Sequence, residues 1–207
     1  MPRAARHQQT SSRRARRRDG RRIGILRAAA RIFRDRGFAE SGMRDIAEAA
    51  DLSPANLYHY FSGKDEILYF CQDRSLDLML NAVARSRSGG DGLTGRLRHV
   101  LQAHAHAVLD EVDGGAAHLA VDALPDPLRR KIVAKRDRYE HALRRLVTEG
   151  AKRGEFVECD AAVTTRAMLG AINWSATWYR PGGEWPASAV ADMIVSYLVR
   201  GLTAKAA

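Results

Sequence analysis

The sequence predicts an all-α protein in which a small N-terminal domain is joined to a larger C-terminal domain. Apolar residues recur three or four positions apart through most of the chain, which is the spacing of one face of an α-helix. No stretch alternates polar and apolar residues over a useful length, so essentially no β-sheet is expected. A length of 207 residues, 45% of them hydrophobic, suits this division and gives enough material for a core.

The first helix is expected at residues 21–36, with Gly37 placed to close it in the left-handed conformation. Residues 1–22 carry nine arginines and one acid, so +8 of the formal net charge of +10 lies there. Residues 1–20 are almost free of large apolar side chains. We therefore expect them to form a mobile, disordered basic arm that is attracted to polyanions. The alternative is a solvated tail without a role.

Two short helices and a tight turn are expected next. The first covers residues 43–50, whose apolar side chains lie on one side. Ser53 is a favourable N-cap and Pro54 suits the first helical position, so the second helix begins there and runs to about Phe61. A helix of two turns is not stable alone. Leu57 and Phe61 should therefore pack on neighbouring helices and leave the opposite face open.

Residues 25–64 resemble the helix-turn-helix of TetR-type transcriptional regulators. The matching segments are ILRAAARIFRDRGF (25–38), MRDIA (43–47) and SPANLYHYFSGK (53–64). The resemblance implies that the two short helices bind double-stranded DNA. The position that opens the first of them, usually Ser or Thr in the family, is Gly42, which offers no hydroxyl to a phosphate. Ser41 is the candidate replacement.

The resemblance and the residue chemistry together indicate which residues contact DNA. Arg44 suits direct readout, because a guanidinium can bond O6 and N7 of guanine together in the major groove; an ordinary surface charge is the alternative. Asn56 and His59 can each bond a base edge or a phosphate, and the remaining polar groups suit phosphates. The full expected set is Arg44, Ser53, Pro54, Ala55, Asn56, Tyr58, His59, Tyr60 and Lys64.

The rest of the chain also has helical periodicity. A long helix at residues 65–85 should link the two domains, and the segment SRSGGDG (86–92) is the strongest loop signal. Further helices are expected at residues 93–111, 115–124, 126–150, 160–179 and 186–202.

The segments Asn173-Trp174 and WYRPGG (178–183) resemble the C-terminal domain of TetR regulators of fatty-acid and steroid catabolism. In that branch the ligands are acyl-CoA thioesters. The resemblance implies a homodimeric repressor that binds a palindromic operator and is released by a small-molecule effector, an acyl-CoA of lipid or steroid catabolism. The expected domains are the basic arm (1–20), a helix-turn-helix domain (21–69) and a ligand-binding and dimerisation domain (70–207).

Polar residues at apolar positions suggest where the ligand binds. His104 interrupts an apolar stripe, so it should be buried, where an imidazole needs a partner. The expected ligand-binding residues are His104, Asp122, Asn173, Trp174, Trp178 and Arg180. A satisfied core histidine and tryptophans that only fill the core remain open as alternatives.

The expected helix at residues 160–179 carries two apolar stripes about 100° apart. One contains Ala167, Ala171, Trp174 and Trp178, and the other contains Met168, Ile172 and Ser175. A helix that is apolar on two sides has two partners. One should be its own domain, and the family resemblance implies that the other is the same helix in a second subunit.

No metal, cofactor or catalytic site is expected. His104 and His106 point about 200° apart on a helix and cannot hold one ion together. His118 and Asp122 could form an acid–base pair, but no nucleophile motif or phosphate-binding loop accompanies them, so an enzyme is not expected.

The sequence also indicates the compartment. Cys71 and Cys159 lack metal-ligand spacing and are expected as reduced thiols. No signal peptide and no apolar run of membrane-spanning length is found, so we expect a cytoplasmic protein without membrane contact.

Two other functions stay open at this point. A TetR-type repressor of an efflux pump would respond to a lipophilic drug or pigment instead of a thioester. A helical small-molecule-binding protein or enzyme would resemble a DNA-binding protein only by chance.

Overall fold

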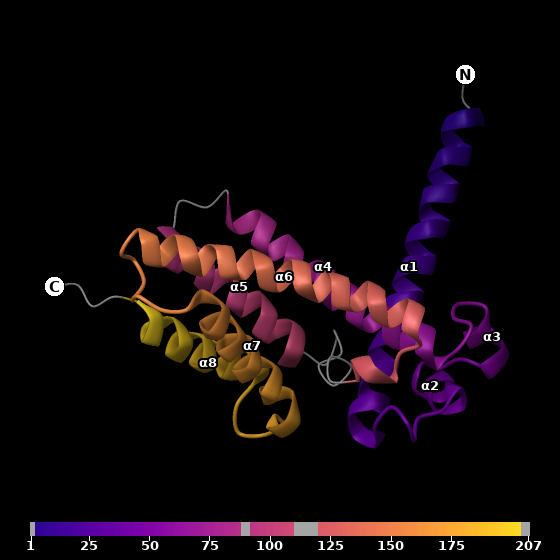
Figure 1. The fold of residues 1–207 in the computed structure, drawn as a ribbon. Helices are drawn as coiled ribbons and strands as arrows, with labels where there is room; N and C mark the ends of the chain where they lie inside the picture. Colours follow the sequence, from indigo (N-terminus) through magenta and orange to yellow (C-terminus); the bar gives the residue numbers. More distant parts are fainter. Residues whose placement is uncertain (1–2, 88–91, 110–119, 204–207) are drawn as a thin grey trace.

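The computed structural model describes residues 3–87, 92–109 and 120–203, with the backbone alone for residues 3–15. Figure 1 shows a small helical cluster at one end and a longer bundle at the other, joined by α4. Among the described residues the only strand-like pairing is one antiparallel bridge, so the all-α prediction is confirmed. The elements are α1 (Arg3–Arg36), α2 (Met43–Ala49), α3 (Pro54–Tyr58), α4 (Lys64–Ser86), α5 (Gly92–Leu109), the 3-10 helix η2 (Val121–Ala123), α6 (Asp126–Lys152), α7 (Ala161–Trp178) and α8 (Ala187–Leu202).

The N-terminal cluster is built from α1, α2 and α3 around a shared core. Leu57 and Phe61 are buried in the same hydrophobic core as Ile25 and Ile46, and their burial is as the sequence predicts. Gly37 adopts a φ of 78° and its N–H bonds the carbonyl of residue 33, so it ends α1 in the left-handed conformation. The short helix α3 is therefore held by the side chains it buries.

The first helix is longer than the sequence pattern indicated. It begins at Arg3 instead of near residue 21, and Figure 1 shows this extension projecting away from the rest of the molecule. The structure thus differs from the expected disordered arm. Ala, Arg and Gln are favourable helix formers, so local propensity extends the helix without packing. The described side chains of residues 16–20 are exposed.

The long helices α4 and α6 lie side by side in the bundle (Figure 1). An ion cluster joins them, in which Lys135 of α6 pairs with Asp73 and lies 2.8 Å from Oδ1 of Asp77 on α4. Burial lowers the pKa of Lys135, but hydrogen bonds to the two carboxylates and their charges raise it overall. The ammonium therefore stays charged and ties α6 to the linking helix.

The C-terminal bundle is centred on α5, which contacts α4, α6, α7 and α8. Leu97 and Leu101 of α5 are fully buried there. After α6 the chain turns back so that the ring of Phe156 lies against Gly150, where a Cβ atom would overlap the ring. This close approach lets the turn pack on the end of α6.

The helix predicted at residues 115–124 lies only partly within the described residues, and its described part is not α-helical. Residues 115–119, which include His118, lie outside the described residues, and only the 3-10 helix η2 follows them. Leu124 is extended because it precedes Pro125, and a residue before proline is disfavoured in the helical region. The other C-terminal helices lie close to their predicted ranges.

Two further expectations concern chemistry and membranes. Cys71 is buried, Cys159 is half-buried, and neither forms a disulfide in the described chain. No helix within the described ranges is long and apolar enough to cross a membrane.

Candidate functional site

The recognition surface is built around α3. Ser53 caps this helix, since its Oγ accepts a hydrogen bond from the backbone N–H of Asn56 at 3.2 Å. Pro54 stands at the first helical position, where no N–H is needed. With Leu57 fully buried, the opposite face is left open to solvent. The exposed side chains of α3 and its two capping residues are Ser53, Pro54, Ala55, Asn56, Tyr58 (55% exposed) and His59.

Arg44 of α2 lies exposed in the same N-terminal cluster. The neighbouring Asp45 is turned toward α1, where it accepts a hydrogen bond from Arg36 at 2.9 Å. It also accepts one from the N–H of Gly42 at 2.8 Å, which closes the start of α2 without a hydroxyl cap. Arg44 forms no hydrogen bond or ion pair with any described residue, so its guanidinium is available to a ligand outside the chain.

Three polar residues expected at phosphates have other partners. Lys64 donates to the carbonyls of Phe38, Ala39 and Ser41 at 3.0–3.1 Å, which uses all three ammonium protons. The hydroxyl of Ser41 is buried and bonds the carbonyl of Gly37, so it does not replace the missing cap hydroxyl. Tyr60 is half-buried against the core. These side chains stabilise the turns around the two short helices, and the open set is smaller than the sequence suggested.

A cavity of about 420 Å³ lies among the helices of the C-terminal domain. It brings together three of the predicted ligand-binding residues, His104, Asp122 and Asn173, from three separate segments of the chain. The other lining residues are Leu76 and Met79 of α4, Val121 of η2, Arg136, Tyr139 and Glu140 of α6, and Leu169 of α7. Because α4 begins in the N-terminal cluster, the cavity lies directly against the helix that links the two domains.

His104 is buried in the cavity wall and has the partner that its position required. Its Nε2 lies 3.0 Å from Oδ1 of Asn173. Burial lowers the pKa of His104 to about 4 and outweighs the bond to Asn173, which raises it; the charge of Arg136 lowers it further. The imidazole is therefore neutral at neutral pH.

Tyr139 packs edge-on against His104, with ring centroids 5.3 Å apart. Burial raises the pKa of its phenol, so the hydroxyl keeps its proton. Neither the Tyr139 hydroxyl nor Nδ1 of His104 has a hydrogen-bond partner among the described residues. The cavity wall thus combines apolar side chains with two residues whose polar atoms have no partner in the described ranges.

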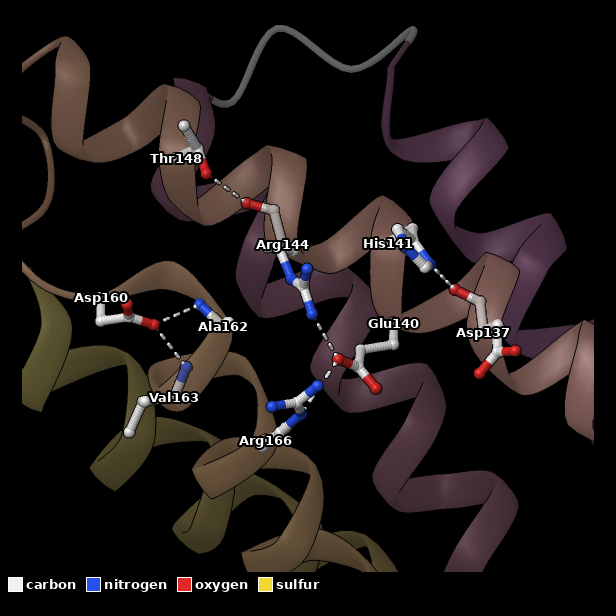
Figure 2. Close-up of polar contacts among 9 residues, drawn as sticks. All are labelled: Asp137, Glu140, His141, Arg144, Thr148, Asp160, Ala162, Val163 and Arg166. Atoms are coloured by element: carbon white, nitrogen blue, oxygen red, sulfur yellow. Dashed lines mark hydrogen bonds and ion pairs between the residues drawn. The ribbon is translucent and has the colours of Figure 1, made fainter.

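Charged residues border the same cavity. Burial lowers the pKa of Arg136, while the nearby charge of Asp122 acts in the opposite direction. Figure 2 shows Glu140 between two arginines, and its Oε1 lies 2.8 Å from Arg144 and 3.3 Å from Arg166 of α7. Just before α7, the carboxylate of Asp160 caps the helix by accepting two backbone N–H groups (Figure 2). Of these contacts, the pair of Glu140 and Arg166 joins α7 to α6 beside the cavity.

The other three predicted ligand residues lie outside this cavity. Trp174 is 66% exposed and Trp178 is 51% exposed, because they lie on the side of α7 that faces away from the core. Arg180 bonds the carbonyls of Thr177 and Tyr179 at 3.1 Å and closes the end of α7. The structure therefore places these three residues outside this cavity, and their contact with a ligand stays a prediction.

An apolar face remains uncovered on α7 and α8. The inward stripe of α7 is confirmed, since Met168, Ile172 and Ser175 are buried. The second stripe is open, and α8, which contacts α7, also has exposed large apolar side chains. The large apolar members of this face are Val163, Trp174 and Trp178 of α7 with Met193 and Tyr197 of α8.

The residues of α6 that line the cavity were not predicted from the sequence. Tyr139 and Arg136 were not expected to contact a ligand, although Tyr139 lies in the same apolar stripe as Ile132 and Leu143. A hydroxyl within a buried stripe is the signal that could have found it. No cluster of three metal-binding side chains occurs in the part of the chain that the structure describes.

A helix-turn-helix cluster joined by one helix to a cavity-bearing helical body defines the class of one-component DNA-binding regulators. The family model "Bacterial regulatory proteins, tetR family" matches residues 25–69, and "Tetracyclin repressor-like, C-terminal domain" matches residues 90–202. The chain therefore belongs to the TetR family of transcriptional regulators.

Full-length relatives support this assignment. The HTH-type transcriptional repressor KstR2 of Rhodococcus jostii (strain RHA1) is 31% identical over 196 residues, which cover 88% of this chain and 91% of KstR2. The structure of the ketosteroid transcriptional regulator KstR2 of Mycobacterium tuberculosis shares the fold, with a TM-score of 0.79 and 23% identity over 89% of this chain and 96% of that one. AibR, crystallised with isovaleryl coenzyme A and operator DNA, gives a TM-score of 0.71 at 24% identity, over 86% and 98% of the two chains. The family consists of transcriptional regulators and the KstR2 of Rhodococcus jostii is a transcriptional repressor, so the chain is a regulator and not an enzyme.

Proposed function

We propose that the protein is a homodimeric cytoplasmic repressor that binds a palindromic operator and releases it when an acyl-CoA of lipid or steroid catabolism enters the C-terminal cavity. The observation that carries this proposal is the cavity itself, which has polar groups on an apolar wall and shares α4 with the DNA-binding cluster. We retain residues 21–69 as the DNA-binding domain and residues 70–207 as the ligand-binding and dimerisation domain.

In the proposed complex α3 enters the major groove. Arg44 and Asn56 are the candidates for base edges, and His59 for a base edge or a phosphate. Ser53 and Tyr58 suit the phosphate backbone, whereas Pro54 and Ala55 are small enough for close approach. A phosphate contact by Lys64 would have to replace one of its three carbonyl bonds, and Tyr60 acts mainly through packing.

The exposed face of α7 and α8 is the proposed dimer interface. Large exposed apolar patches mark interaction sites, and a two-fold dimer buries the same patch on both subunits. Trp174→Asp should produce monomers in analytical ultracentrifugation, whereas Val133→Asp on the exposed side of α6 should leave the dimer intact. A Trp174→Asp protein that stays dimeric would move the interface elsewhere.

An acyl group suits the cavity by size and chemistry. A volume of about 420 Å³ accommodates an acyl chain or a small ring system, and the nucleotide part of coenzyme A must lie outside it. Leu76, Met79 and Leu169 supply apolar contacts, and Arg136 supplies a cation. AibR binds isovaleryl coenzyme A and KstR2 is a ketosteroid regulator, which favours thioesters from lipid or steroid catabolism.

The ligand would act on DNA binding through α4. This helix forms part of the cavity wall and is held to α6 by Lys135. Nearer its N-terminus, the ring of Phe70 contacts the rings of Tyr69 and of Phe61, which follows α3. A ligand that binds one arrangement of α4 and α6 more tightly shifts the population toward it. Such coupling is typically about 1–3 kcal/mol, or about 5- to 150-fold in operator affinity.

The test combines gel shift on the upstream DNA of its own gene with calorimetry on a panel of acyl-CoAs, the corresponding free acids, CoA alone and neutral lipophiles. We expect at least one thioester to bind and weaken the operator complex, with CoA alone inactive. Release by a neutral lipophile and by no thioester would replace the acyl-CoA assignment with the efflux-pump alternative.

A further inference from the structure

Two residues of the cavity wall each bury one polar atom that no described residue satisfies, and these atoms indicate what the ligand carries. His104 and Tyr139 are each 3% exposed, and neither His104 Nδ1 nor the Tyr139 hydroxyl forms a hydrogen bond within the described residues. An unsatisfied buried polar group destabilises a fold, and apolar side chains of similar shape would avoid that cost. Two such groups on adjacent rings of one cavity point to a bound partner.

The protein fixes the hydrogen-bonding role of each atom. Oδ1 of Asn173 can only accept a hydrogen bond, so the Nε2 that lies 3.0 Å away must carry the proton. In a neutral imidazole the other nitrogen then has a lone pair, which makes Nδ1 of His104 an acceptor. The phenol of Tyr139 keeps its proton and can donate. One acceptor and one donor therefore belong to two residues of the cavity wall whose rings pack together, with centroids 5.3 Å apart.

We propose that the part of the ligand that enters the cavity bears a hydroxyl group, which donates to His104 Nδ1 and accepts from the Tyr139 hydroxyl. The inference rests on the proposed function, because it concerns the same cavity. A keto oxygen or a carboxylate can only accept, so either would satisfy Tyr139 and leave Nδ1 facing a second lone pair. The favoured class is a hydroxylated acyl chain or ring, held by Leu76, Met79 and Leu169 on its apolar sides.

The experiment compares matched thioesters on the full-length protein by calorimetry. The probes are cyclohexanecarboxyl-CoA and its hydroxy and oxo derivatives, with the substituent at ring position 3 or 4. One hydroxy isomer should bind about tenfold tighter than the parent, because it adds two net hydrogen bonds. It should also bind tighter than the oxo compound of the same position.

Two variants locate the effect. Tyr139→Phe should reduce the advantage of the hydroxy isomer to about threefold or less, without lowering the melting temperature, because it removes a hydroxyl that no described residue satisfies. Tyr179→Phe makes the same chemical change outside the cavity wall and should keep the full advantage. A destabilised Tyr139→Phe protein would show that the hydroxyl is satisfied within the fold, and the inference would fail.

The remaining outcomes separate this inference from the proposed function. Equal affinity for parent, hydroxy and oxo thioesters would mean that a bound water occupies the two atoms. A preference for the oxo compound would reverse the assigned hydrogen-bonding roles. Either result overturns the hydroxyl inference and leaves the proposed function standing. If no thioester binds, the acyl-CoA assignment fails. Cyclohexanol and cyclohexanone then test the hydroxyl assignment by thermal shift. We expect cyclohexanol to raise the melting temperature of wild type more than that of Tyr139→Phe. The absence of that difference would overturn the hydroxyl assignment as well.

Discussion

Acid should destabilise the protein through the buried imidazole of His104. An unfolded histidine titrates near pH 6.5, whereas burial lowers the pKa of His104 to about 4 in the folded chain. The unfolded chain therefore takes up a proton first as the pH falls. Stability from this residue is complete above pH 6.5 and is lost as the pH falls toward 4. A difference of about 2.5 pH units at about 1.36 kcal/mol per unit gives a loss of about 3 kcal/mol.

Urea denaturation between pH 7.5 and pH 4 measures this loss. Carboxylates also titrate in this range, so the comparison is with His104→Gln, which lacks the imidazole. Wild type should lose about 3 kcal/mol more than His104→Gln over the range. The control His106→Gln, which changes an exposed histidine of the same helix, should follow wild type. Parallel curves for wild type and His104→Gln would refute the burial argument.

Three further predictions concern DNA binding and coupling. Arg44→Ala should cost about 1–3 kcal/mol in operator affinity and relax preference at one base pair, and an equal loss on all DNA sequences would make it a phosphate contact. Deleting residues 1–20 should flatten the salt dependence of DNA binding by about 0.9 per lost phosphate contact, and an unchanged slope would make the arm irrelevant. Lys135→Met, which removes the tie between α6 and α4, should preserve ligand affinity in calorimetry but reduce ligand-driven operator release in gel shift. An unaltered release would show that coupling runs through other contacts.

Periodicity and local chemistry were sufficient to predict most of the fold. The positions of Leu57 and Phe61 in the core followed from the short length of α3, which must be held by the side chains it buries. The burial of His104 followed from its place in an apolar stripe, and its need for a partner followed from the cost of an unpaired polar group. These inferences depend on spacing within one helix.

The differences between expectation and structure concern which of several possible partners a side chain meets. Trp174 and Trp178 lie on an apolar stripe, but spacing cannot tell whether that stripe faces a cavity or a second subunit. Lys64 was expected at a phosphate, but carbonyls left free by the turn after α1 lie within its reach. The role of Tyr139 depends on the packing of α6 against α5, which no local pattern encodes.

Filling the cavity tests the central claim most directly. Leu169→Trp places a large ring in the wall of the cavity, whereas Val133→Trp makes a comparable change at a 41% exposed position of α6. Operator affinity is measured for both variants with and without the tightest-binding thioester of the panel. We expect both to bind the operator as wild type does, and only Leu169→Trp to lose release by the ligand. Undiminished release from Leu169→Trp would contradict the claim that this cavity controls DNA binding.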